Sequence, residues 1–158
     1  MAYSVRRPLL RSLAVLFCGA VAVRCSVWVM SPSPAGLGVL DNRLAVCPDR
    51  PNCVSTFSQA VEHRIDPIPF RGSPDNLIQK LKTIVTELPR TRVVRQASNY
   101  LHVECRSLWF GFVDDVEFLV DVEQQLIQFR SASRVGYSDL GVNRQRMETI
   151  RRACHGTL

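Results

Sequence analysis

The sequence has few of the residues from which metal centres are built. Its three histidines, His63, His102 and His155, are far apart in the chain. Cys47 and Cys53 lie close together, but no second close cysteine pair follows them. A structural zinc site takes four cysteine or histidine ligands, usually in two closely spaced pairs. We therefore predict no bound metal and no cofactor.

The chain also lacks Gly-x-Ser-x-Gly, the pattern that carries the nucleophile of many serine hydrolases. Ser131 and Ser133 have no histidine near them in the sequence. His102 would have to approach them across a sheet, and a single histidine on a strand is more often a surface residue. Asp115 and Glu117 remain as a candidate general acid and base, with arginines holding an anionic substrate. A hydrolase-like enzyme is therefore the alternative interpretation of function, and the leading one is non-catalytic binding.

Acidic residues are absent from residues 1–30, which carry four arginines and a long apolar stretch. Three of the arginines precede the apolar residues 13–23, and "AVA" at 20–22 is a candidate cleavage site for a signal peptide. Apolar residues resume after Arg24, so an uncleaved membrane anchor is the other interpretation. In both cases the positively charged residues before the apolar segment remain on the cytoplasmic side of the membrane. We therefore expect the following domain to be exported (periplasmic, lumenal or secreted) or membrane-anchored with the domain outside.

The net charge of +6 is due mainly to this first segment. After residue 30, sixteen basic residues face fourteen acidic ones, so the rest of the chain is nearly neutral. A nucleic-acid-binding domain would show a basic surplus of its own. We therefore expect no nucleic-acid partner. A small anion or an acidic protein partner is expected instead, and the membrane through residues 1–30 if these are not cleaved.

The remainder is long enough for one domain. Residues 31–46 begin with a Pro/Ser/Gly-rich stretch and are predicted as a linker. Residues 47–154 are predicted as a single domain and residues 155–158 as a tail. Cys47 and Cys53 flank the short loop "CPDRPNC". In an oxidising compartment they would form a disulfide, the alternative being two reduced thiols in an ordered turn.

The hydrophobic periodicity predicts two helices. Ser73 as the N-cap and Pro74 at the first helical position start one helix, whose apolar residues recur on one face until Pro89. The second helix is expected to start between residues 139 and 142 and to end near Cys154. Its residues Met147, Ile150 and Cys154 form one apolar face.

Between the helices, alternating apolar residues predict about four strands, at 91–97, 99–108, 115–123 and 125–133. Their short connections favour an antiparallel sheet. The order of elements then predicts an α+β two-layer sandwich with both helices packed on one face. Two further segments, 47–58 and 63–70, are expected to be an irregular loop and an edge or non-strand arm.

Alternation gives the predicted sheet two different faces. Leu101, Phe118 and Phe129 would lie under the helices. The other face would carry polar residues whose side chains meet across neighbouring strands, and the acids there could contact Arg130. The simplest interpretation is a solvated face with ordinary ion pairs. Its residues are His102, Glu104, Arg106, Asp115, Glu117, Asp121, Gln128 and Arg130.

The densest polar stretch is "RSASRVGYSDLGVNRQRME" at 130–148. Gly136 permits a sharp turn, and Ser138 or Asp139 can cap the helix that follows. A helix N-terminus suits an anion, and arginine forks bind carboxylate or phosphate. The predicted ligand-binding residues are Arg130, Ser133, Arg134, Asn143 and Arg144. The predicted supporting acids are Asp114, Asp115, Glu117 and Asp139.

The same stretch allows other interpretations. If Asp139 occupies the helix terminus itself and the arginines pair with the other acids, the group is a structural network that fixes the turn. The acids could also bind a divalent cation, although the arginines would compete. Separately, the aromatic segment "SLWFGF" at 107–112 could form a docking surface at a membrane, unless its side chains are buried.

Three segments of the chain resemble one family. "CPDRPNCVS", "YLHVECRSLWFGFVDDVEF" and "IQFRSASRVGYSDLGVNRQRMETIR" are similar, in this order, to the family known as domain of unknown function 1499. The resemblance covers about 47–154 and includes all the site residues named above. It implies no established activity, substrate or cofactor. It also implies an exported, membrane-anchored or plastid-targeted protein, which agrees with the N-terminal segment.

Overall fold

The computed structural model describes Val15, Cys18, Gly19 and residues 31–158. The predicted signal peptide or anchor therefore lies almost entirely outside the described residues. Among those that are described, no helix is both long and apolar enough to cross a membrane.

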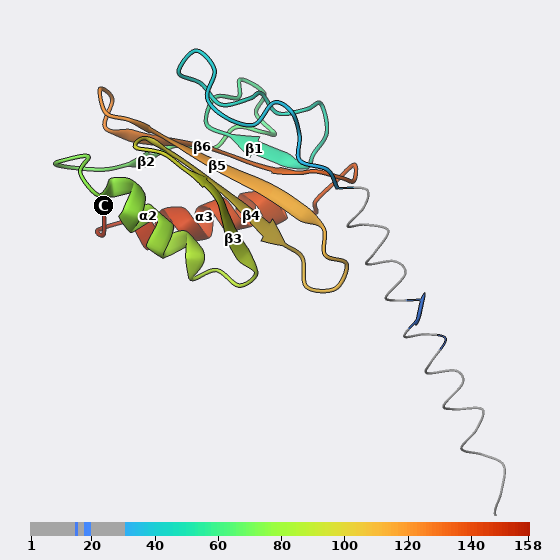
Figure 1. The fold of residues 1–158 in the computed structure, drawn as a ribbon. Helices are drawn as coiled ribbons and strands as arrows, with labels where there is room; N and C mark the ends of the chain where they lie inside the picture. Colours follow the sequence, from blue (N-terminus) through green and yellow to red (C-terminus); the bar gives the residue numbers. More distant parts are fainter. Residues whose placement is uncertain (1–14, 16–17, 20–30) are drawn as a thin grey trace, which may run out of the picture.

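The domain is an antiparallel sheet of six strands with two helices, which confirms the α+β class. The strands lie in the order β1-β6-β5-β4-β3, and β2 also pairs with β6. Both helices lie on one face of the sheet (Figure 1). The strands are β1 (Cys53–Ser55), β2 (Ile68–Pro69), β3 (Thr91–Gln96), β4 (Tyr100–Arg106), β5 (Val113–Asp121) and β6 (Leu126–Ser133). The helices are α2 (Leu77–Thr86) and α3 (Val142–Cys154).

The prediction of about four strands was wrong because β1 and β2 were not recognised. β1 lies within the segment predicted as an irregular loop, and pairs with β6 from Cys53 opposite Ala132. β2 has only two residues and pairs with the start of β6. Strands this short show no measurable alternation. Both are stabilised by pairing with a strand more than fifty residues away, which local sequence does not reveal.

Helix α2 starts later than predicted. Ser73 does not cap it: its hydroxyl accepts the Asp75 backbone N–H at 3.1 Å and donates to the Asp75 carboxylate at 2.7 Å. The residue before the helix is Asn76, in the left-handed conformation with φ 61°. Ser73 and Pro74 thus form a turn ahead of the helix. The apolar face was predicted correctly, and Leu81 is fully buried.

The main core lies between the helices and the sheet. Phe118 of β5 and Phe129 of β6 are opposite each other in the register, with ring centroids 6.4 Å apart. Met147 and Ile150 of α3 are buried against the same core. These are the faces that the alternation predicted.

The other face of the sheet was predicted to be solvated, but it is covered over β4, β5 and β6 and stays exposed along β3. The chain segments before and after β1, from Ser31 to about residue 60, lie over it (Figure 1). Leu44 is buried and packs with Tyr100 and Leu119, and the Gly38 backbone N–H donates to Glu117 at 2.7 Å. The segment predicted as a linker is therefore part of this cover, and it excludes water from the polar residues beneath it.

Candidate functional site

The predicted ligand-binding residues are divided between the two faces of the sheet. Arg130 and Arg134 lie on the face covered by the N-terminal segment. Ser133 and Asn143 hydrogen-bond on the helix side, at 3.0 Å. Arg144 lies elsewhere and donates to the carbonyl oxygens of residues 62 and 64. The structure thus forms two polar groups instead of one site.

The first group, here called the arginine cluster, consists of Arg92, His102, Glu104, Arg106, Asp115 and Arg134. At its centre, Arg134 forms a two-pronged contact with Asp115, with Nε–Oδ2 and Nη2–Oδ1 distances of 2.8 Å. Its Nη2 also donates to Glu104 at 2.6 Å, and its Nη1 to the Ser31 carbonyl at 3.1 Å. The Arg134 side chain is only 6% exposed. One buried guanidinium therefore joins two acids to Ser31, where the continuous described range begins.

Glu104 is contacted by three guanidinium groups. Arg134 donates to Oε1 of Glu104. Arg92 and Arg106 both donate to Oε2, at 2.9 and 3.2 Å. The register places Arg92 opposite Glu104 on the neighbouring strand. The predicted meeting of Glu104 with Arg130 does not occur. Glu104 instead holds two surface arginines close together through one oxygen atom.

These contacts set the protonation of the two acids. Burial by itself would raise the pKa of Glu104, but hydrogen bonds from Arg92 and Arg134 outweigh it and lower the pKa below its usual value. Burial opposes a low pKa at Asp115 as well, and hydrogen bonds from Arg134 and His102 again lower it. Both carboxylates are therefore ionised at neutral pH. A general acid at neutral pH needs the opposite shift.

His102 Nε2 lies 2.8 Å from Asp115 Oδ1, and both residues are buried. This pair resembles two members of a hydrolytic triad. Among the described residues, however, no serine or cysteine hydrogen-bonds to His102. Through Asp115, which also accepts from Arg134, the pair is part of the ion-pair cluster.

Glu117 is fully buried and lies beside the arginine cluster. Its Oε1 accepts hydrogen bonds from the Tyr100 hydroxyl and the Gly38 N–H, both at 2.7 Å. Arg130, opposite it in the register, contacts Oε2 at 3.5 Å. Burial and the bond to Glu117 raise the pKa of Tyr100, so its proton stays in place. Glu117 thus fixes the N-terminal cover to the sheet and is closed to a substrate.

The second group, here called the α3 network, consists of Asp114, Ser131, Ser133, Asn143 and Arg146. The Asn143 Oδ1 accepts from Ser131 at 2.5 Å and from Arg146 at 2.7 Å. Ser133 and Arg146 both donate to Asp114, at 2.6 and 2.5 Å. These side chains lie between β5, β6 and the first turns of α3. The network therefore fixes the helix to the end of the sheet.

The N-terminus of α3 already holds a carboxylate. Asp139 accepts the Asn143 backbone N–H at 2.8 Å and the Gly141 N–H at 2.9 Å. Gly141 has φ 81°, a conformation that favours glycine. The geometry at this point matches the alternative in which Asp139 fills the helix terminus and Arg134 pairs with an acid.

The four supporting acids do not gather around one point. Asp114 faces the helices, Asp115 and Glu117 face the cover, and Asp139 caps α3. Among the described residues, no group of three histidine, cysteine or acidic side chains is arranged to hold a metal ion.

Comparison with known proteins gives a family but no function. The family model described as "Protein of unknown function (DUF1499)" matches residues 43–154. The chain belongs to this DUF1499 family. No curated protein and no solved structure matches it significantly.

Two participating residues of this DUF1499 protein were missed by the sequence analysis. Arg92 could have been found by extending the alternation to β3, since it lies on the same face as Glu104 and opposite it. Arg146 lies one helical turn after Asn143, which places both on one side of α3.

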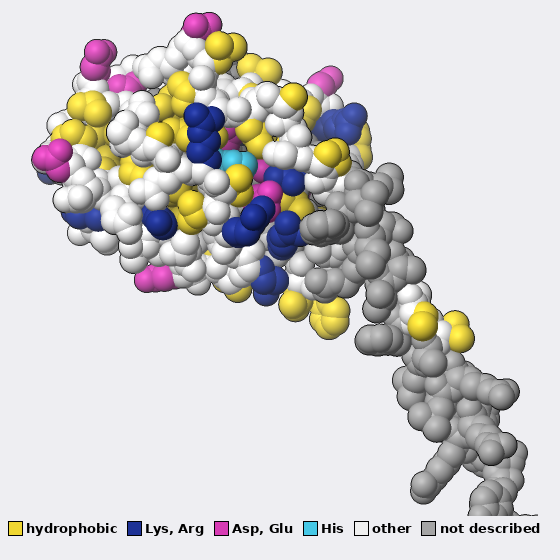
Figure 2. Space-filling model, in the orientation of Figure 1, with side chains coloured by type: hydrophobic (Ala, Val, Ile, Leu, Met, Phe, Trp, Pro, Cys, Tyr) yellow, Lys and Arg dark blue, Asp and Glu magenta, His cyan; other side chains and the backbone are white. Residues whose placement is uncertain are grey.

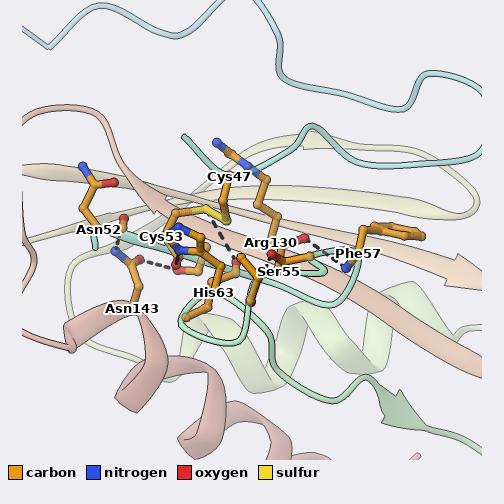
Figure 3. The surroundings of a disulfide bond; sticks show 12 residues. Cys47, Asn52, Cys53, Ser55, Phe57, His63, Arg130 and Asn143 are labelled. Carbon is orange, nitrogen blue, oxygen red and sulfur yellow. Dashed lines mark hydrogen bonds between the residues drawn. A yellow bond between two sulfur atoms is a disulfide. The ribbon is translucent and has the colours of Figure 1, made fainter. Parts of the chain in front are cut away.

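The predicted disulfide is confirmed: Cys47 and Cys53 are bonded, with Cα atoms 5.6 Å apart (Figure 3). Cys53 starts β1, and its carbonyl oxygen lies 2.9 Å from His63 Nδ1. The bond therefore closes a loop of the cover and fixes it to the edge of the sheet.

Reducing this disulfide should lower the free energy of unfolding by about 2 kcal/mol, the chain-entropy value for so short a loop. Urea unfolding with and without dithiothreitol measures the effect. The Cys47→Ala variant is the control, because its stability should not respond to the reductant. An unchanged wild-type midpoint would show that the bond does not constrain the unfolded chain.

Proposed function

We propose that this DUF1499 domain is a non-catalytic binding domain, and that the arginine cluster binds an anionic group. The ligand class is a carboxylate or phosphate, carried by a small molecule or by an acidic protein partner. Residues 1–30 favour an exported or membrane-anchored protein, so the partner would be met outside the compartment of synthesis.

The observation that carries the proposal is the arrangement of Arg92 and Arg106 around Glu104. Both arginines donate to one oxygen of this single carboxylate. Their side chains are 65% and 31% exposed. Among the described residues, neither guanidinium has another partner. Each therefore keeps free N–H donors, and two like charges held together favour a further anion between them.

The surroundings are also positive. Arg90 Nε donates to the Arg106 carbonyl at 3.0 Å, and Arg95 lies over the Tyr100 ring. Figure 2 shows Lys and Arg side chains gathered on this face, over β3 and β4, around acidic and histidine side chains. Such a surface raises the local concentration of anions.

The position differs from the predicted one, with Arg134 common to both. In the proposed site Arg134 lies beneath the surface and holds Glu104, which in turn orients the two exposed arginines. A ligand would contact Arg92 and Arg106 and leave the buried ion pairs intact. Ligand binding and folding can therefore be separated by mutation.

Arg92→Ala and Arg106→Ala are each expected to weaken anion binding by about ten-fold or more, because each removes charged hydrogen bonds worth roughly 1.5–3 kcal/mol. Their stability should change by less than about 1 kcal/mol, as is usual for exposed ion pairs. Titration calorimetry of the full chain with phosphate, sulfate and citrate measures the affinity.

Arg71→Ala is the matched control, because Arg71 is an exposed arginine outside the cluster. Equal affinities in all three variants would contradict the proposal. So would a wild-type protein that binds none of the three anions and no acidic peptide.

A further inference from the structure

The connection between β4 and β5 carries the largest exposed aromatic group among the described residues. Trp109 is 78% exposed, and Phe110 and Phe112 are 52% and 39% exposed. Leu108 between them and β4 is also half-exposed. Single exposed apolar residues are ordinary, but a contiguous group marks an interaction surface. We call residues 107–112 the aromatic loop.

The aromatic loop is held in this conformation by its own contacts. The Ser107 N–H donates to the Phe112 carbonyl, and the Phe112 N–H to the Ser107 hydroxyl, both at 2.9 Å. Gly111 has φ 72°, which turns the chain sharply. The rings of Phe110 and Phe112 lie 5.6 Å apart and contact each other instead of the core. The exposure of these aromatic side chains therefore follows from the conformation of the β4–β5 connection itself.

The aromatic loop lies at the end of the domain where the N-terminal segment begins. The Ser31 carbonyl accepts a hydrogen bond from Arg134, whose backbone N–H donates to Val113, the residue after the loop. Figure 1 shows the β4–β5 connection, the β6–α3 connection and the start of the blue N-terminal segment of the domain at this same end. Residues 13–30, which come directly before Ser31, are apolar except for Arg24 and Ser26. An inserted N-terminal segment would thus place the loop next to the bilayer.

We propose that the aromatic loop docks the domain onto a phospholipid bilayer. Tryptophan and other aromatic side chains prefer the interface between lipid tails and headgroups. Arg106 and Arg90 lie at the base of the loop and are joined by a hydrogen bond, in a position to contact lipid phosphates. Tyr137 and Leu140 in the β6–α3 connection, 73% and 93% exposed, extend the apolar surface at this end.

A bilayer suits this surface better than a soluble partner. The exposed apolar residues lie on two loops at the end of the domain where Ser31 lies, and two arginines lie at the base of the aromatic loop. An inserted N-terminal segment would tether the domain beside the bilayer. The effective concentration of lipid at the aromatic loop would then be high, so even weak contacts with lipid would be populated. The inference does not depend on the proposed anion site, because lipid contact by Trp109 needs no bound anion.

The test uses fluorescence quenching in the full chain. The sequence has two tryptophans, so Trp28→Phe leaves Trp109 as the only one. This variant is reconstituted into phospholipid vesicles that carry bromine on their acyl chains. The expected result is a blue-shifted emission that the bromine atoms quench.

The control is the triple variant Trp28→Phe, Trp109→Phe, Val122→Trp. Val122 is 51% exposed and lies in the β5–β6 turn, at the other end of β5. A nine-residue strand separates the two positions by roughly 27–30 Å. Bromolipid quenching at Trp109 should therefore be roughly three-fold or more that of the V122W control.

Each other outcome overturns the inference. Equal quenching at the two positions, or no association with the vesicles, shows that the loop does not contact lipid. A Trp109 that is quenched by acrylamide but not by bromolipid lies in water. A Trp109 protected from both quenchers is covered by protein, for which a second copy of this chain is the first candidate.

Discussion

Replacing Arg134 by alanine is expected to lower the free energy of unfolding by about 3–5 kcal/mol. This is the usual cost of removing one partner from a buried ion pair, because the other charge is left without compensation. Here two acids, Asp115 and Glu104, lose their shared guanidinium, and both are at most 5% exposed at the side chain. Urea unfolding at neutral pH measures the loss.

Arg92→Ala is the matched control for this prediction. Arg92 also contacts Glu104, but its side chain is 65% exposed, and exposed ion pairs contribute at most about 1 kcal/mol. A loss in Arg134→Ala no larger than that in Arg92→Ala would contradict the buried-pair argument. Arg134→Lys should be intermediate, because it keeps the charge and loses the two-pronged geometry.

The pH dependence provides an independent check. In the wild type the pKa values of Glu104 and Asp115 are lowered. The stability they contribute is therefore fully present above their unfolded pKa values and is lost as the pH falls through the lower, folded ones. In Arg134→Ala only His102 still opposes the effect of burial at Asp115, so protonation of Asp115 removes part of the cost of its uncompensated charge. The difference in unfolding free energy between the two proteins should shrink between pH 7 and pH values below about 4.

The sheet and its two faces were predictable because they depend on local alternation. Leu101, Phe118 and Phe129 are on the helix side as predicted, and the acids and arginines alternate with them. The burial of the polar face was not predictable in the same way. It depends on the segment from Ser31 onward, which contacts the sheet through long-range interactions such as Gly38 with Glu117.

In the candidate site, too, some features follow from the local sequence and others depend on long-range contacts. Residue composition identified Arg130–Arg144 as rich in arginine, but the partner of each arginine depends on the strand register. Arg134 pairs with Asp115, while Arg144 finds backbone carbonyls of a distant loop. Only the register could show that Arg92 and Arg106 converge on Glu104. The exposed, positively charged surface therefore lies over β3 and β4, away from the stretch where arginines are densest in the sequence.

The two polar groups imply different consequences for mutation. The arginine cluster extends to the surface, so some of its members can be changed with little effect on folding. The α3 network is enclosed between the sheet and a helix. We therefore expect all of its members to act on stability.

Asn143→Ala is expected to cost about 2–4 kcal/mol of unfolding free energy. Asn143 is fully buried, and its Oδ1 is the acceptor for Ser131 and Arg146. Its removal leaves both donors without this partner, and an unsatisfied buried donor costs roughly 1–3 kcal/mol. Chemical denaturation followed by circular dichroism measures the loss.

Asn99→Ala is the matched control, because Asn99 is exposed and contributes a backbone carbonyl, not its amide, to the structure. Asn143→Asp separates hydrogen bonding from packing. It keeps the size and the acceptor oxygen, but replaces the donor to Ser133 with a carboxylate near Asp114. It should be destabilised at neutral pH and recover in part as the pH falls, because protonation restores a donor. Stability equal to Asn99→Ala in both Asn143 variants would mean that α3 is fixed by its apolar face alone.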